Sequence, residues 1–212
     1  MAVVILDSIF ETSYYGDSYD PESPQTPIAF AFGRDEKTMV WHENSDEEFV
    51  GKLCSESEIC QWGSADVGRG KAARETRRLA MIPAGTFDYQ GKFEVFDEEA
   101  FSSSTIGFMK LPVTSVKGYS GFVKQIAGAL RRPPYGIFTK VKVVPDNKTL
   151  FKVIFEPIAN IPDGLIPIIL ELRAEAQALI DFPYPPAEKI EQPKKQQRGK
   201  VSTTKVTKSR KY

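Results

Sequence analysis

The stretch YGIFTKVKVVPDNKTLFKVIFEPI, residues 135–158, decides the fold. Two runs rich in β-branched and aromatic residues, 135–144 and 149–158, flank the turn-forming residues PDNK. This pattern predicts a β-hairpin and therefore an antiparallel sheet. Side chains alternate between the two faces of a strand, so the first run should have a core face and a solvent face. We expect the core face to be Ile137, Thr139, Val141 and Val143, and the solvent face to be Phe138, Lys140, Lys142 and Val144.

Elements outside the hairpin indicate a mixed fold. Apolar residues between 113 and 130 recur at helical spacing, and a second helical pattern ends near Asp181. Pro133 and Pro134 end the first helix. Four shorter segments have the composition of strands or extended chain: 28–33, 37–42, 77–84 and 91–96. We therefore expect a mixed α/β (α+β) fold, an OB-like antiparallel β-barrel with added helices and a basic loop.

The formal net charge of zero conceals a gradient along the chain. Residues 1–60 have a net charge of −10, residues 61–187 of +3 and residues 188–212 of +7. Segregated charge indicates separate electrostatic roles for separate segments. The C-terminal segment has few side chains to bury, which favours disorder. We expect an acidic N-terminal arm or loop, an OB-like nucleic-acid-binding domain and a basic disordered tail, at residues 1–27, 28–184 and 185–212.

Several features of the sequence point to the cytoplasm. No run of about 18 apolar residues occurs, so we expect no transmembrane helix and no membrane partner. The opening residues MAVVILDSIFETS lack the basic region and the cleavage site of a signal peptide. The two cysteines, Cys54 and Cys60, fit a reducing compartment.

Residues 62–81, WGSADVGRGKAARETRRLAM, combine glycines with five positive charges. A nucleotide-binding loop needs the spacing G-x-x-x-x-G-K-[ST] between a strand and a helix. Gly63 and Gly68 have that spacing, but Arg69 and Gly70 occupy the lysine and hydroxyl positions. A phosphate loop is therefore not expected. Cations beside an aromatic ring are typical of a groove that binds single strands without sequence preference, and a solvated basic loop is the alternative.

The candidate interface consists of positive charges and flat aromatic rings from several elements. Phosphate contacts are expected from Arg69, Lys71, Arg74, Arg77, Arg78, Lys117, Lys124, Arg131, Arg132, Lys140, Lys142 and Lys152. Base stacking is expected from Trp62, Phe122, Tyr135 and Phe138. Tyr119 is a further stacking candidate. A place in the core is the alternative for both Tyr119 and Phe122, and for Tyr119 we favour the core. Affinity built on phosphate contacts and stacking implies low sequence preference and strong salt dependence.

Residue types for catalysis or metal binding are sparse. The acidic runs at 46–48 and 97–99 could hold Mg²⁺ in a nuclease, but neither follows an apolar strand, and solvated surface is the expected role. His42, Cys54 and Cys60 could provide three zinc ligands, whereas a structural zinc site normally has four. Whether these three residues bind a metal stays open at this point. We expect no cofactor and no enzymatic activity.

Two long segments resemble a group of bacteriophage proteins of the single-stranded-DNA-binding type. They are CQWGSADVGRGKAARETRRLAMIPAG at 60–85 and LPVTSVKGYSGFVKQIAGALRRPPYGIFTKVKVVPDNKTLFKVIFEP at 111–157, within a match over 28–184. The resemblance implies an OB-like fold and a role at replication or recombination intermediates in the host cytoplasm, with replication or recombination proteins as further partners. Members of the group carry several cysteines before WGS and one in the GKA run, where this chain has Ala72 and Ala73. The resemblance therefore implies that any zinc site of the relatives is lost here.

Three functional hypotheses follow from the sequence. The first is non-enzymatic binding of single-stranded DNA, or of RNA, which the sequence does not distinguish. The second is a metal-dependent nuclease or accessory enzyme, which needs carboxylates that converge in a pocket. The third is a virion or interaction protein with an incidental basic face, which predicts no salt-dependent DNA binding. The basic C-terminus also differs from the acidic, partner-recruiting tail of many single-strand-binding proteins, so recruitment by that route is not expected.

Overall fold

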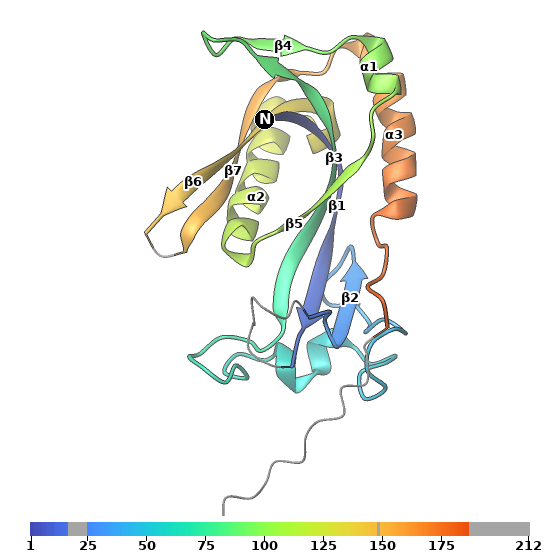
Figure 1. Ribbon diagram of the computed structural model, residues 1–212, viewed down its shortest axis with the longest axis vertical. Coiled ribbons are helices and arrows are strands. Elements are labelled where there is room, and N and C mark those ends of the chain that lie inside the picture. Colours follow the sequence, from blue (N-terminus) through green and yellow to red (C-terminus); the bar gives the residue numbers. More distant parts are fainter. Residues whose placement is uncertain (17–24, 148, 187–212) are drawn as a thin grey trace, which may run out of the picture.

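The computed structural model describes residues 1–16, 25–147 and 149–186 (Figure 1). Its strands are β1 (Ala2–Tyr14), β2 (Ala29–Gly33), β3 (Arg74–Phe87), β4 (Phe93–Val95), β5 (Gly107–Leu111), β6 (Ile137–Asp146) and β7 (Leu150–Asn160). Its α-helices are α1 (Glu98–Ser102), α2 (Val113–Gln125) and α3 (Ile166–Leu179). A π-helical turn, Ile126–Leu130, extends α2. The short 3-10 helices are Cys54–Glu56, Glu58–Cys60, Pro134–Gly136 and Asp163–Leu165. No helix in the described ranges is long and apolar enough to cross a lipid bilayer.

Within the described residues, seven strands form one antiparallel sheet in the order β4-β3-β1-β6-β7, with β2 paired to β1 and β5 paired to β3. The register places Ile5 of β1 opposite Met81 of β3, and Val141 of β6 opposite Phe155 of β7. No pairing joins β5 to β7 in this part of the chain, so the sheet is open. The predicted mixed α+β fold on an antiparallel sheet is confirmed, and the sheet does not close into a barrel.

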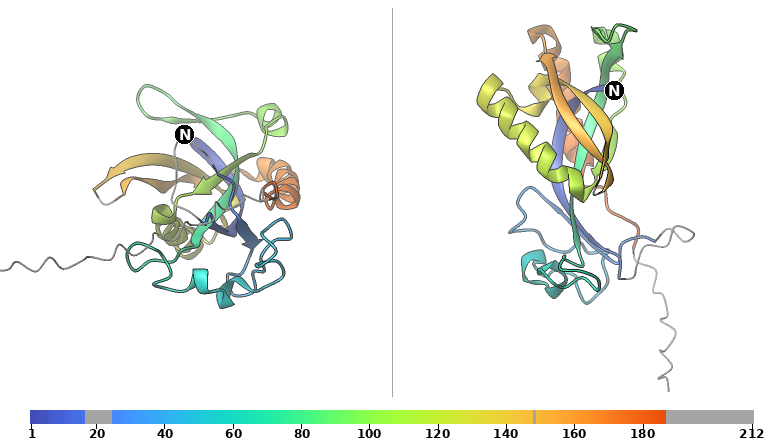
Figure 2. Two further views of the ribbon diagram at one scale, coloured as in Figure 1. Left: turned by 60° about the horizontal axis from the view of Figure 1, so that its bottom comes forward. Right: turned by 90° about the vertical axis from the view of Figure 1, so that its left-hand side faces the viewer.

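A helix covers each face of the sheet, and α2 and α3 lie on opposite sides of β1 in Figure 1. On one face, Tyr119 and Ile126 of α2 and the turn after it form a buried cluster with residues of β1, β3, β6 and β7. On the other face, Ile169 and Ala176 of α3 pack on β1 and β3. Figure 2 shows α2 lying against the hairpin β6–β7, with which it is in contact. The core is therefore two layers of side chains, one on each side of the sheet.

Two predicted stacking residues belong to this core. Phe138 is 3% exposed and packs beside Phe93 and Phe101. Phe122 is 4% exposed and packs against Phe155. Along β6, Ile137, Thr139 and Val141 are buried as expected, but Val143, which was expected in the core, is 67% exposed. On the second face Phe138 is buried, and Lys140 and Lys142 are partly buried. The prediction that Phe122 and Phe138 stack on bases is therefore wrong.

The N-terminal segment is a central strand, and the predicted arm at residues 1–27 is wrong for most of its length. β1 pairs with β2, β3 and β6, and Ala2 to Leu6 are buried. The run AVVIL is apolar enough to be buried on both faces of a sheet, so the folded domain begins near residue 2 and not at residue 28. Residues 17–24 and 187–212, which include almost all of the predicted disordered tail, lie outside the described residues.

The strand predicted at 37–42 does not form. Val40 makes an isolated bridge with Leu53, and Trp41 enters a third buried cluster. The same composition fits a strand and a packed loop, so tertiary packing decided between them. This cluster fixes the segment between β2 and β3 against one end of β1, and its buried members are Ala29, Ala31, Met39, Trp41, Cys54, Cys60 and Ala73.

Candidate nucleic-acid interface

Residues 61–73 form a loop that its own hydrogen bonds hold in place at one end of the sheet (Figure 1). The Ser64 hydroxyl accepts from the Ala72 N–H at 2.9 Å, and the Gly63 N–H donates to the Gly70 carbonyl at 2.9 Å. Gly63 has a φ of 91°, which glycine adopts without a side-chain clash. A strand, β3, follows the loop, whereas a nucleotide phosphate loop leads into a helix. The loop therefore has a defined conformation at the surface and lacks the strand–loop–helix arrangement of a nucleotide-binding phosphate loop.

The loop exposes an aromatic ring beside positive charge. Trp62 is 80% exposed, and the Lys71 Nζ lies 5.7 Å from the centroid of its ring. Lys71 also forms an ion pair with Glu75, with 2.5 Å between Nζ and Oε1. Arg69 and Arg74 are exposed in the same segment. Four of the predicted contact residues therefore belong to one segment, in which Trp62, Arg69 and Arg74 are exposed and Lys71 is partly exposed.

Arg77 and Arg78 point to opposite faces of β3, because side chains alternate along a strand. Arg77 lies on the α2 face, half-buried, with its guanidinium carbon 3.7 Å from the centroid of the Phe10 ring. Arg78 lies on the α3 face and is 3% exposed. Its Nε donates to Glu11 Oε2 at 2.9 Å and its Nη1 donates to the Phe182 carbonyl at 2.7 Å. The prediction that Arg78 contacts nucleic acid is wrong, because internal acceptors enclose its guanidinium.

Arg78 belongs to a buried ion-pair cluster centred on Glu11. The Glu11 carboxylate lies 2.7 Å from the Lys110 Nζ and accepts a hydrogen bond of 2.7 Å from the Tyr184 hydroxyl. Burial alone would raise the pKa of Glu11, but Lys110 and Arg78 outweigh it and hold that pKa below its usual value. Burial would likewise lower the pKa of Lys110, but Glu11 raises it above its usual value. The cluster joins β1, β3, β5 and the chain after α3, so its role is structural.

The hairpin lysines Lys140, Lys142 and Lys152 are less free to contact phosphates than the strand pattern predicted. Lys142 pairs with Glu156 at 2.7 Å, and Lys152 pairs with Asp146 at 3.2 Å. The Lys140 Nζ lies 4.2 Å from the centroid of a phenylalanine ring. These lysines remain partly or fully exposed, and two of them are paired with carboxylates of the same hairpin, as Lys71 is with Glu75. The predicted aromatic–lysine face of β6 therefore does not form as expected.

Exposed cations follow the outer surface of α2 and continue past its end. Lys117 and Lys124 are seven residues apart and both exposed. Arg131 and Arg132 are exposed after the π-helical turn, which Arg131 ends with a left-handed backbone, φ 52°. These four positions agree with the predicted basic surface, but they lie on a different element from loop 61–73.

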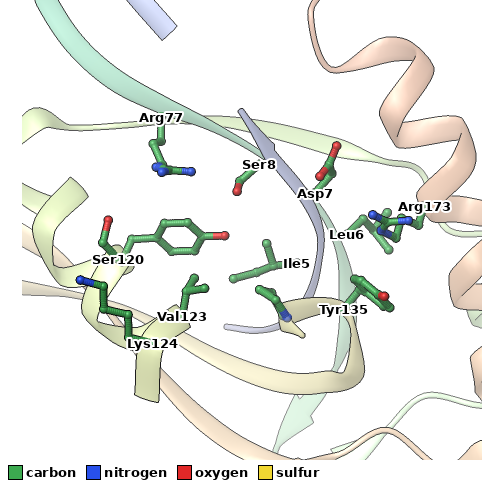
Figure 3. A pocket seen from close by; sticks show the side chains of 12 residues that line it. Ile5, Leu6, Asp7, Ser8, Arg77, Ser120, Val123, Lys124, Tyr135 and Arg173 are labelled. Carbon is green, nitrogen blue, oxygen red and sulfur yellow. The ribbon is translucent and has the colours of Figure 1, made fainter. Parts of the chain in front are cut away.

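A cavity brings together three predicted residues from separate elements. Arg77 of β3, Lys124 of α2 and Tyr135 before β6 all line it (Figure 3). Tyr119 and Arg173 line it too. Tyr119 was a stacking candidate for which the core was the favoured place, and it is 1% exposed. Arg173 was not predicted for the site, because it belongs to a helix whose pattern indicated packing alone. No local signal places Arg173 near Arg77, because their proximity depends on how two helices pack around β1.

The residues considered as metal ligands have packing roles. The His42 Nδ1 accepts from the Asn44 N–H at 3.0 Å, and the His42 ring stacks on Phe30. Burial raises the pKa of Cys54 to about 12 and that of Cys60 to about 11. Both thiols belong to the buried cluster that contains Trp41. In the described part of the chain, no three His, Cys, Asp or Glu side chains gather in a way that could hold a metal ion.

The two acidic runs lie at turns. The Asp97 Oδ1 accepts from the Ala100 N–H at 2.9 Å and caps the N-terminus of α1. The Asp46 Oδ1 accepts from the Glu48 N–H at 3.3 Å. Both carboxylates therefore satisfy nearby backbone donors.

No protein-family model matches this chain, and neither a curated protein nor a solved structure matches it. The resemblance to phage single-stranded-DNA-binding proteins therefore stays a prediction. The function has to be inferred from the fold and from the geometry of the site.

Proposed function

We propose that the protein binds single-stranded DNA with low sequence preference, as a non-enzymatic factor in phage DNA replication or recombination. Phosphate contacts and base stacking supply the affinity. The host cytoplasm is the proposed location, and replication or recombination proteins are the proposed additional partners. The observation that carries the proposal is the 80%-exposed Trp62 with Lys71 over its ring, in a segment that also exposes Arg69 and Arg74.

The order of the strands supports an OB-like fold for this function. β1, β3 and β5 form a three-stranded meander, α2 follows it, and hairpin β6–β7 returns to pair with β1. An OB-fold is a five-stranded, partly open barrel that binds oligonucleotides on strands 2 and 3 and on the loops after strands 1 and 4. If β1, β3, β5, β6 and β7 are those five strands, Trp62 lies in the connection between strands 1 and 2. The loop with the exposed aromatic ring is then at a position where OB-folds bind single strands.

Replacing Trp62 with alanine should weaken binding of oligo(dT) by about 5- to 100-fold, because one stacked base contributes roughly 1–3 kcal/mol. Fluorescence anisotropy of a labelled oligonucleotide measures this change. Intrinsic fluorescence of the unmodified protein should also fall on binding, since the other tryptophan, Trp41, is buried and its Nε1 donates to the Ser57 hydroxyl. The fluorescence change thus reports on Trp62.

Tyr89→Ala is the matched control for this experiment. Tyr89 is 94% exposed in the turn between β3 and β4, and that turn is at the opposite end of the molecule from loop 61–73 (Figure 1). This variant should bind like the unmodified protein. Equal affinity of Trp62→Ala and Tyr89→Ala for oligo(dT) would contradict the stacking role of Trp62.

A further inference from the structure

A cavity of about 480 Å³ lies between β1, β3, α2 and α3 (Figure 3). Part of its wall is apolar and comes from Ile5 and Leu6 of β1, Val123 of α2 and the ring of Tyr135. Pockets for small ligands occupy roughly 300–1,000 Å³, so this cavity has room for more than a single ion. It is separate from loop 61–73, whose residues do not line it.

Positive charge dominates the polar part of the wall. Arg77 of β3, Lys124 of α2 and Arg173 of α3 line the cavity, with Arg77 and Arg173 on opposite sides of β1 (Figure 3). Asp7 is the acidic residue among the described residues that line it, and Arg34 neutralises Asp7 with two contacts of 2.6 and 3.1 Å. The wall therefore carries an excess of positive charge that no lining carboxylate balances.

Two guanidinium groups of the wall each hold a buried N–H without an acceptor. The Nε atoms of Arg77 and Arg173 are buried, and neither has a hydrogen-bond partner in the described part of the chain. The guanidinium carbons lie 3.7 Å from the Phe10 ring centroid and 4.5 Å from the Tyr135 ring centroid, so aromatic faces support both groups. Buried polar groups nearly always have hydrogen-bond partners, and an exception points to an ion or water at the site. Burial also lowers the pKa of Arg77, and a bound anion would offset that effect.

We infer that this cavity binds the phosphate group of a nucleotide. Arginine donors match phosphate oxygens in charge and in planar geometry, and Lys124 adds a further positive charge. Tyr135 and Val123 offer an apolar surface to the attached sugar or base. The phosphate comes from a free nucleotide or from one unit of a bound single strand. Binding of a strand phosphate rests on the proposed function. Binding of a free nucleotide does not, because neither Trp62 nor its loop lines the cavity.

Titration of the full chain with dTMP and with inorganic phosphate by calorimetry, and with oligo(dT) by anisotropy, tests this site. Lys124→Glu is the main variant, because Lys124 is exposed and its replacement leaves the core intact. Lys92→Glu is the matched control, an exposed lysine next to the β3–β4 turn that does not line the cavity and is not among the predicted contact residues. Arg77→Gln is the second variant, and its melting temperature shows whether it is folded. We expect Lys124→Glu and Arg77→Gln to weaken dTMP binding by about tenfold or more, and Lys92→Glu by less than about twofold.

The titrations distinguish the two sources of phosphate. Weaker dTMP binding by Lys124→Glu than by Lys92→Glu, with equal oligo(dT) affinity, identifies a free nucleotide as the ligand. Weaker oligo(dT) binding by Lys124→Glu than by Lys92→Glu identifies a strand phosphate, whether or not free dTMP binds.

Two results would overturn the inference. The first is equal affinity of the Lys124→Glu and Lys92→Glu variants for every probe. The second is the absence of dTMP and phosphate binding together with an unchanged oligo(dT) affinity of Lys124→Glu. Either result leaves the proposed function intact if Trp62-dependent binding of oligo(dT) persists. Conversely, dTMP binding without any oligo(dT) binding contradicts the proposed function and supports the cavity site.

Discussion

Replacing Glu11 with alanine is expected to destabilise the folded protein by about 3–5 kcal/mol, because the change leaves the buried Arg78 and the partly buried Lys110 without their carboxylate. Glu11 is fully buried and pairs with Arg78 at 2.9 Å and with Lys110 at 2.7 Å. For a chain of this length, the melting temperature should fall by roughly 10 °C. Thermal unfolding followed by circular dichroism at neutral pH measures the effect.

Glu156→Ala is the matched control for the Glu11 variant. Glu156 pairs with Lys142 on the same sheet, but both side chains of that pair are exposed to solvent. Exposed ion pairs contribute about 0–1 kcal/mol, so this variant should unfold close to the unmodified protein. A loss of stability no larger for Glu11→Ala than for Glu156→Ala would show that the buried cluster does not hold the sheet together.

The lowered pKa of Glu11 also sets a pH dependence. A carboxylate with a lowered pKa in the fold stabilises the protein above its unfolded pKa, about 4.3 for glutamate, and this stabilisation is lost as the pH falls through the lower folded value. The Glu11→Gln variant lacks this titration. Its stability should therefore decline less steeply than that of the unmodified protein below about pH 4.

The triple replacement of Arg69, Lys71 and Arg74 by alanine should weaken oligo(dT) binding and change its salt dependence. Each lost phosphate contact flattens the slope of log K against log salt by about 0.7 for a single strand, so three lost contacts flatten it by about 2. At low salt the affinity should fall by more than about tenfold. These three side chains lie outside the buried clusters, so the melting temperature should stay close to that of the unmodified protein.

Lys92→Ala provides the control for nonspecific loss of charge, since Lys92 is exposed near the β3–β4 turn at the far end of the molecule (Figure 1). Its salt slope should match that of the unmodified protein. An unchanged salt slope in the triple variant would show that loop 61–73 does not contact the phosphates.

The elements whose periodicity and end residues are both visible in a short stretch of sequence could be predicted. The hairpin β6–β7 has two alternating runs around a turn, and α2 and α3 have apolar residues at helical spacing, so all three form where expected. β1 was not predicted, because residues 1–60 are strongly acidic and the apolar run at the start of the strand is short. One of these acidic residues, Glu11, is buried in β1, where it pairs with Arg78 and Lys110, which are distant in sequence.

The candidate site could be predicted only in part. Trp62, Arg69, Lys71 and Arg74 lie in one exposed segment, so their adjacency in sequence was enough to group them. The alternation of a strand indicates that Arg77 and Arg78 face opposite sides, but it does not indicate which side is buried. That choice depends on α3 and on the chain after it, where the Phe182 carbonyl meets Arg78.

The most direct test of the central claim is the affinity of the protein for single-stranded and double-stranded oligonucleotides of the same sequence and length, measured at low and high salt. A matching RNA strand in the same titration distinguishes DNA from RNA as the ligand. We predict tighter binding to the single strand at both salt concentrations, with affinity falling as salt rises, because a duplex hides its bases from Trp62. Equal affinity for the two forms, or no salt-dependent binding of either, would contradict the proposal that the protein binds single strands by stacking and phosphate contacts.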